Sequence, residues 1–141
     1  MRDASMKVLV VEPRTLPYEK EVPDELAALR EIVGGHIQAI YPFRDNAVLV
    51  CNEDGIAQKL EFNRMIPERK YGGIFGTFFV CGLGGENFIS LTPEQMKTYK
   101  KRFQKAEMIL AVNGGNPVIA KIDAIRKQPP DKPKPPRKPT R

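Results

Sequence analysis

The most apolar stretch of the chain is Gly72-Gly73-Ile74-Phe75-Gly76-Thr77-Phe78-Phe79-Val80-Cys81-Gly82. Its second half, residues 77–81, is rich in aromatic and β-branched side chains and carries no charge. That composition is typical of a strand in the middle of a sheet, where both faces are covered. We therefore predict a central strand from Thr77 to Cys81 and place the rest of the fold around it.

Shorter apolar segments with turn signals at their ends precede this strand. They predict further strands at residues 7–12, 18–22, 36–41 and 46–52. The second of these lies between Pro17 and Pro23, and proline favours the edge of a sheet because it cannot donate to the ladder. Asp54-Gly55 is a turn signal after the fourth. Residues 56–70 fit neither a helix nor a strand well, so their structure stays open.

Two stretches carry the signals of a helix. Over residues 24–33, apolar side chains recur three and four positions apart, and Gly34-Gly35 follows as a stop. The second stretch begins at Thr92-Pro93-Glu94-Gln95, which predicts a capping box with proline in the first turn. We expect this helix to run to about Val112, followed by a short last helix within residues 117–125.

Together these segments predict an α+β fold, a mostly antiparallel sheet of four to six short strands with two main helices on one face. The 141 residues divide into a single domain, 1–125, and a tail, 126–141. The tail has six prolines in sixteen residues and no larger apolar side chain, which predicts disorder. It also holds the whole net charge of +6, because residues 1–125 contain sixteen basic and sixteen acidic side chains.

The chain offers few groups for catalysis or metal binding. His36 is the single histidine, and a turn explains the adjacent carboxylates Glu53-Asp54. Cys51 and Cys81 form no C-x-x-C pair and are expected to be buried thiols. We therefore predict no catalytic residue, no cofactor, no metal and no enzymatic activity. The apolar run Val8-Leu9-Val10-Val11 is far too short for a signal sequence or a membrane span, so we expect a cytoplasmic protein without membrane contact.

The second helix carries a strongly basic face, formed by Lys97, Lys100, Lys101, Arg102 and Lys105. Such a charge run is usually a solvated face, and it could also meet nucleic acid or an acidic partner. The tail adds further cations that could make weak nucleic-acid contacts, namely Lys132, Lys134, Arg137 and Lys138.

An apolar seam runs along the same helix. Met96, Tyr99, Phe103, Ala106 and Leu110 follow a 3, 4, 3, 4 spacing. Packing on the chain's own sheet is one explanation, and a contact with a second copy is the other. Because Ile109 lies off this seam, the helix is apolar on more than one side. We therefore predict a homodimer through Met96, Tyr99, Phe103 and Ile109. The alternative is that the apolar side chains of residues 118–125 fold back over the second side.

The order of several motifs resembles that of a domain family of unknown function found in phages and conjugative elements of gut bacteria. The resemblance covers residues 7–104 and rests on Val8-Leu9-Val10-Val11-Glu12-Pro13, on residues 29–37, on Tyr41-Pro42-Phe43, and on residues 50–55 and 76–82.

The resemblance implies an inhibitor of a bacterial defence nuclease, specifically an anti-CRISPR protein that binds type II-A Cas9 with its guide RNA. Because residues 1–125 are neutral, blocking a protein surface fits better than imitating the charge of DNA. The alternative is a nucleic-acid-binding accessory module that uses the basic helix face and the tail.

Overall fold

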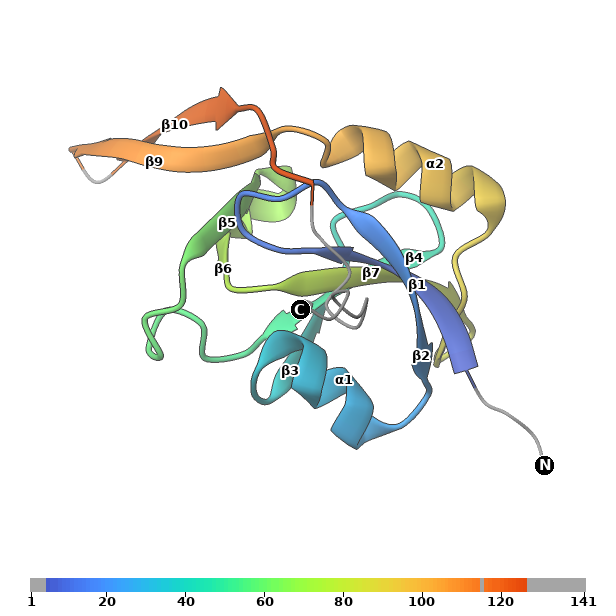
Figure 1. The fold of residues 1–141 in the computed structure, drawn as a ribbon. Coiled ribbons are helices and arrows are strands. Elements are labelled where there is room, and N and C mark those ends of the chain that lie inside the picture. Colours follow the sequence, from blue (N-terminus) through green and yellow to red (C-terminus); the bar gives the residue numbers. More distant parts are fainter. Residues whose placement is uncertain (1–4, 115, 127–141) are drawn as a thin grey trace, which may run out of the picture.

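The computed structural model describes residues 5–114 and 116–126 (Figure 1). The elements are β1 (Ser5–Val11), β2 (Tyr18–Pro23), α1 (Leu26–Val33), β3 (Ile37–Ile40), β4 (Ala47–Asn52), β5 (Phe62–Ile66), the short 3-10 helix η1 (Glu68–Lys70), β6 (Gly72–Phe75), β7 (Phe78–Gly84), β8 (Asn87–Ile89), α2 (Pro93–Arg102), β9 (Ala106–Asn113) and β10 (Asn116–Ile122). The predicted disordered tail lies outside the described residues, apart from Arg126.

The main sheet is built around β7. In the described part of the chain it has six strands in the order β2-β1-β7-β4-β3, with β8 pairing the far end of β7, and every pair is antiparallel. Phe79 is the register partner of both Val10 on β1 and Val50 on β4. The predicted central strand and the predicted edge strand β2 are therefore confirmed.

The two helices cover opposite faces of this sheet (Figure 1). Phe78 belongs to the core beneath α2, whereas Phe79 belongs to the core beneath α1. The α+β class with a mostly antiparallel sheet is confirmed, but the placement of both helices on one face is wrong. Because β7 has large side chains on both faces, and both phenylalanines are completely buried, each face needs its own cover.

The start of α2 follows the sequence prediction. The hydroxyl of Thr92 accepts a hydrogen bond from the Gln95 amide at 3.1 Å, and the Gln95 side chain accepts one from the Thr92 amide at 3.0 Å. This is the predicted capping box, which satisfies two backbone donors that the first turn would otherwise leave free.

The chain beyond α2 differs from the prediction. The helix ends at Arg102 instead of Val112, and residues 106–122 form the antiparallel hairpin β9–β10 instead of more helix. The β-branched Ile109 and Val112 favour a strand, and Asn113-Gly114 favours a tight turn in which Gly114 takes a positive φ of 60°. The prediction of a last helix within residues 117–125 is wrong for the same reason.

The open stretch between β4 and β7 forms a second small sheet. Residues 53–59 are turns, and β5 then pairs with β6 instead of returning to β4. β5 also packs against β9, so this small sheet lies between the main sheet and the hairpin (Figure 1).

Candidate interaction surface

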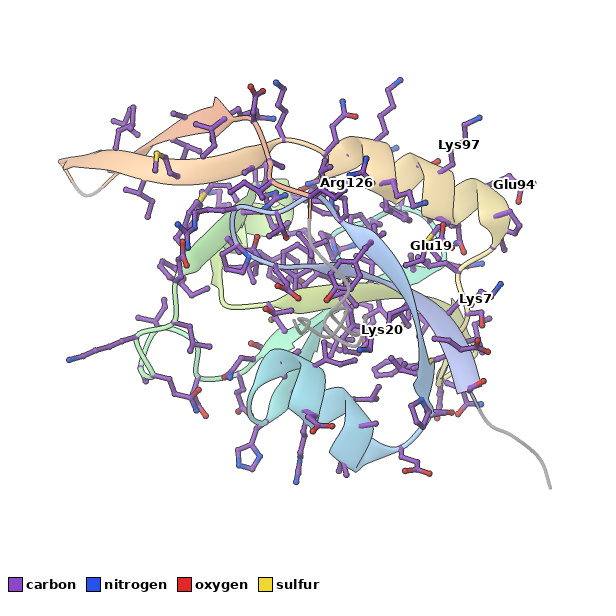
Figure 2. All side chains as sticks on the ribbon, in the orientation of Figure 1. Lys7, Glu19, Lys20, Glu94, Lys97 and Arg126 are labelled. Atoms are coloured by element: carbon purple, nitrogen blue, oxygen red, sulfur yellow. The ribbon has the colours of Figure 1, made fainter. Side chains whose placement is uncertain are left out.

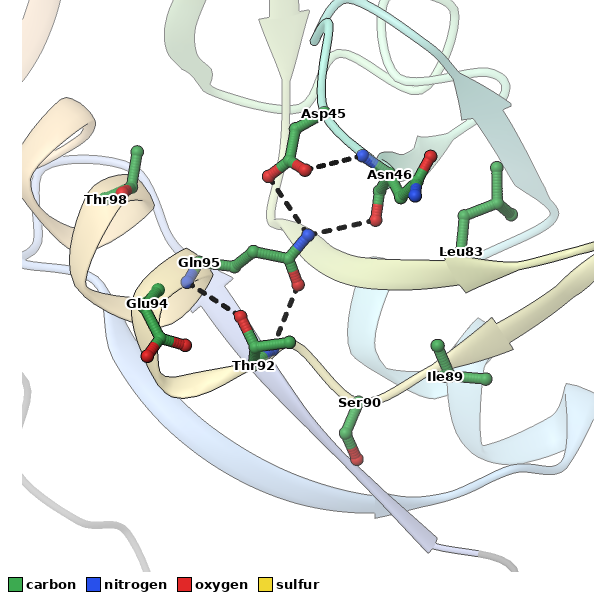
Figure 3. A pocket seen from close by; sticks show the side chains of 9 residues that line it. All are labelled: Asp45, Asn46, Leu83, Ile89, Ser90, Thr92, Glu94, Gln95 and Thr98. Atoms are coloured by element: carbon green, nitrogen blue, oxygen red, sulfur yellow. Dashed lines mark hydrogen bonds between the residues drawn. The ribbon is translucent and has the colours of Figure 1, made fainter.

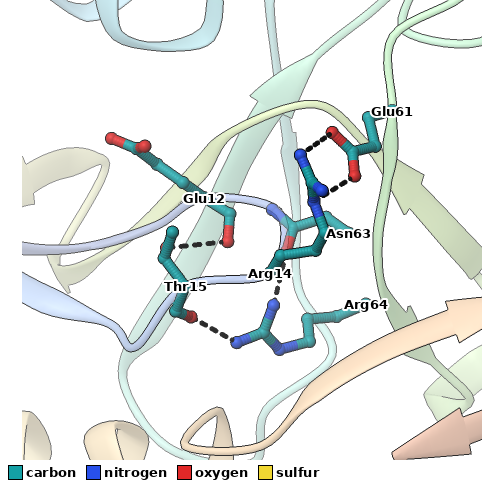
Figure 4. A network of polar contacts seen from close by, with 6 residues as sticks. All are labelled: Glu12, Arg14, Thr15, Glu61, Asn63 and Arg64. Atoms are coloured by element: carbon teal, nitrogen blue, oxygen red, sulfur yellow. Dashed lines mark hydrogen bonds and ion pairs between the residues drawn. The ribbon is translucent and has the colours of Figure 1, made fainter. Parts of the chain in front are cut away.

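A buried arginine sets the position of the hairpin. The guanidinium of Arg64 on β5 donates hydrogen bonds to the Thr15 carbonyl at 2.9 Å and to the Phe103 carbonyl at 2.7 Å. It also donates to Asn63 Oδ1 at 2.7 Å (Figure 4). Burial lowers the pKa of Arg64 to about 10, opposed by nearby Glu107, so it stays charged at neutral pH. Because Phe103 follows the last residue of α2, Arg64 fixes the point where the helix ends.

Three further contacts hold the base of the hairpin. Glu107 Oε1 accepts a hydrogen bond from the Met65 amide at 2.9 Å, which ties β9 to β5. Lys105 and Asp123 form an ion pair across the base at 2.9 Å. Beyond β10, the Ile125 amide donates to the Arg14 carbonyl at 2.9 Å, so the returning chain also attaches to the body.

The rest of the hairpin projects beyond the body (Figure 1). It exposes Leu110 by 62%, Val118 by 43%, Met108 by 40% and Ile109 by 36%. We call these four side chains the hairpin patch. Residues 108–120 contain no charged side chain at all. A contiguous apolar surface of this kind is typical of a contact site for another macromolecule.

The predicted basic face of α2 is largely neutralised. Arg102 forms a bidentate pair with Glu68, at 2.6 and 2.9 Å, and this contact lowers the pKa of the Glu68 carboxyl. Lys100 pairs with Glu19 of β2, and Lys105 with Asp123.

Only Lys97 and Lys101 of the predicted basic set make no ion pair within the described residues. Figure 2 shows Lys97 extending away from the body, one turn along the helix from Glu94. The predicted contact residues Lys132, Lys134, Arg137 and Lys138 lie outside the described residues.

The predicted dimer seam is part of the core. Met96, Tyr99 and Phe103 are 6%, 5% and 2% exposed and pack beneath α2. The ring of Phe103 meets that of Phe78 edge to face, with centroids 5.3 Å apart. Of the seam, Ile109 alone remains on the surface in the part of the chain that is described, and it lies on β9. The alternative weighed from the sequence, packing on the chain's own sheet, is correct for the other three.

The largest hollow among the described residues is an open groove of about 480 Å³ beside the start of α2 (Figure 3). Its polar groups are engaged with one another. Asp45 accepts hydrogen bonds from Gln95 Nε2 at 3.0 Å and from the Asn46 amide at 2.7 Å, which lower the pKa of its carboxyl. Tyr99 also donates to Asp45, at 3.2 Å. A carboxylate held as a hydrogen-bond acceptor in this way is a poor general base.

The remaining reactive groups are similarly placed. Cys51 and Cys81 are buried, as expected, and burial raises the pKa of their thiols to about 11 and about 12. Thiols held protonated in this way are weak nucleophiles. Over residues 5–114 and 116–126, no three His, Cys, Asp or Glu side chains come together as a metal site. None of the helices in these ranges has the length and apolar character needed to cross a membrane.

Fold and surface thus define an α+β domain with an added apolar hairpin. Residues 6–104 match the family described as Domain of unknown function (DUF3846), and the chain belongs to this family. Comparisons with curated proteins and with solved structures give no match. The predicted resemblance to a family of unknown function is confirmed over nearly the predicted range. The match ends two residues before β9 begins, so the hairpin lies outside it.

Sequence reasoning missed the hairpin as a surface. The signal was present in Asn113-Gly114-Gly115-Asn116, a turn-forming stretch between two uncharged apolar runs. It was outweighed by the helical spacing that continues from α2 through Leu110. The buried Arg64 gave no signal, because its partners Thr15 and Phe103 are 49 and 39 residues away along the chain.

Proposed function

We propose that the chain is a protein-binding domain that works by occupying a surface of another protein, and that the hairpin patch is its contact surface. The observation that carries the proposal is the exposure of Met108, Ile109, Leu110 and Val118 on a stretch without charge. Apolar side chains held out in water on an anchored ribbon are stabilised when a partner covers them.

The charges of the body support a protein partner over a nucleic acid. Binding to phosphates needs several free cations along one face. On α2, the cations of Lys100 and Arg102 are already paired with Glu19 and Glu68. A nucleic acid would have to displace these carboxylates or rely on residues beyond the helix.

The target proposed here is type II-A Cas9 bound to its guide RNA, in the cytoplasm of a bacterial host. This part of the proposal rests on the resemblance to domains of phages and conjugative elements. The neutral charge of residues 1–125 supports a block of a protein surface over imitation of DNA.

The proposal is tested by capturing purified Cas9, with and without guide RNA, on the immobilised chain. The wild type is expected to retain Cas9 and to slow its cleavage of target DNA. Leu110→Lys is expected to lose both effects, whereas the matched control Ile56→Lys keeps them. Ile56 is 72% exposed and lies on the turn after β4, far from the hairpin in sequence. Retention that is equal for the two variants would remove the hairpin patch from the proposal, and failure to capture Cas9 would remove this target.

A second arm separates the nucleic-acid alternative. Binding to random duplex DNA is measured over a series of salt concentrations. Phosphate-driven binding would fall with a log–log slope of about 0.9 for each phosphate neutralised. The proposal expects no measurable duplex binding at physiological salt, and tight, steeply salt-dependent binding would favour the accessory module instead.

A further inference from the structure

The outer edge of the hairpin is open and unguarded. Among the described residues, β10 pairs with β9 alone, whereas β9 also packs against β5. An edge strand presents unpaired backbone N–H and C=O groups, and proteins usually guard such edges with charged side chains or proline. Within this chain, β2 is guarded in that way, with Glu19, Lys20 and Glu21 exposed between two prolines. By contrast, residues 116–120 of β10 carry no charge, and Pro117 stands near the strand's start.

The rest of the chain is poorly suited to cover this edge. Residues 127–141 are lysine, arginine, proline and a few polar side chains, without one aliphatic or aromatic residue. A strand added to an apolar hairpin needs apolar side chains on at least one face, and proline cannot donate to a ladder. The occupant must therefore come from outside the chain.

We propose that the edge of β10 pairs antiparallel with β10 of a second copy, which joins two hairpins into one four-stranded sheet. An uncharged edge can meet its own copy without like-charge repulsion, and a two-fold contact requires a surface that is complementary to itself. The inference rests on the proposed function for its purpose, because the joined sheet would present two hairpin patches side by side to one target.

The dimensions of the hairpin support pairing. β9 has eight residues, so the ribbon is about 27 Å long and, with two strands, about 10 Å wide. One such face is smaller than the roughly 800 Å² that each partner contributes to a stable protein interface. Pairing two ribbons doubles the face while the backbone groups of both edges become satisfied. The contact itself is small, so the dimer is expected to form in the micromolar range.

This surface replaces the seam predicted from the sequence. Met96, Tyr99 and Phe103 are buried within one copy and cannot contact another without unfolding the core. Ile109 remains near the new contact, as the register partner of Ile119 on β10.

The test is the mass of the full chain by light scattering after size exclusion, measured from about 10 μM to about 500 μM. The wild type is expected to rise from the monomer mass of 15.9 kDa toward twice that value. Val118→Lys brings like charges together across the two-fold axis and is expected to weaken the dimer at least about tenfold. Val118→Thr keeps a β-branched side chain without charge and is the matched control, expected to dimerise like the wild type. Thermal unfolding of each variant verifies that the fold is intact.

Mixing gives the sharper result. Val118→Lys and Val118→Glu are each expected to be monomeric, and an equimolar mixture is expected to recover the dimer, because diagonal neighbours across paired strands lie about 7–8 Å apart. A wild type that stays monomeric throughout would overturn the inference, as would a dimer that survives Val118→Lys. A monomer that still captures Cas9 would overturn pairing alone, and a dimer that captures no Cas9 would overturn the proposed target alone.

Discussion

Replacing Arg64 with methionine removes the guanidinium and keeps most of the side-chain length. Three hydrogen bonds disappear, and the buried carbonyls of Thr15 and Phe103 lose a donor. Each buried acceptor left unsatisfied costs about 1–3 kcal/mol. Part of this cost is offset, because methionine does not have to be stripped of the hydration of a charge. We expect Arg64→Met to lower the free energy of unfolding by about 2–4 kcal/mol.

The assay is urea unfolding at 25 °C, with Arg14→Met as the matched control. Arg14 forms an ion pair with Glu61 at 2.7 Å, but both side chains are about half exposed. Exposed pairs contribute about 0–1 kcal/mol, so the control is expected to be close to the wild type. If Arg64→Met destabilised the chain no more than Arg14→Met, the assignment of Arg64 as the link between body and hairpin would be refuted.

Three further predictions concern the core, the charges and the tail. Phe78→Ala and Phe79→Ala are each expected to cost about 3–5 kcal/mol in urea unfolding; near-native stability of both would contradict the two-sided core around β7. The hydrogen bond from Arg102 holds the pKa of Glu68 below its ordinary value of 4.5, so this contribution to stability is present above that pH and is lost as the pH falls through the lowered folded-state pKa. Glu68→Gln is therefore expected to flatten the acid limb of a plot of midpoint against pH, and an unchanged limb would argue against the pair. Removing residues 126–141 is expected to leave the thermal midpoint within a few degrees of the full chain, and a larger fall would show that the tail packs on the body.

The sequence predicts best where the signal is local. The central strand and the start of α2 depend on residues that are neighbours in the chain, such as the uncharged run 77–81 and the Thr92–Gln95 pair. The end of α2 was misjudged because Ala106 and Leu110 continue a helical spacing that also suits a strand. Tertiary contacts decide between the two, since Ala106 is completely buried and Arg64 binds the carbonyl of Phe103.

The placement of the helices could have been inferred. A strand that is apolar on both faces implies a layer on each side, so two helices on one face would have left Phe79 or Phe78 in water. The buried charge could not be inferred, because an arginine in an ambiguous stretch gives no sign that it will be enclosed. The same holds for the neutralisation of α2, where Glu19 and Glu68 come from two distant segments.

The attachment of the hairpin at both of its ends has a mechanical consequence. β9 leaves the body beside Arg64, and the chain after β10 returns beside Thr15, which pairs with Ile125. A ribbon held at two roots resists twisting about its long axis, whereas bending across its thin direction remains soft. The tip can therefore tilt toward or away from a partner while its two strands keep their register, and amide exchange should slow steadily from the tip to the roots.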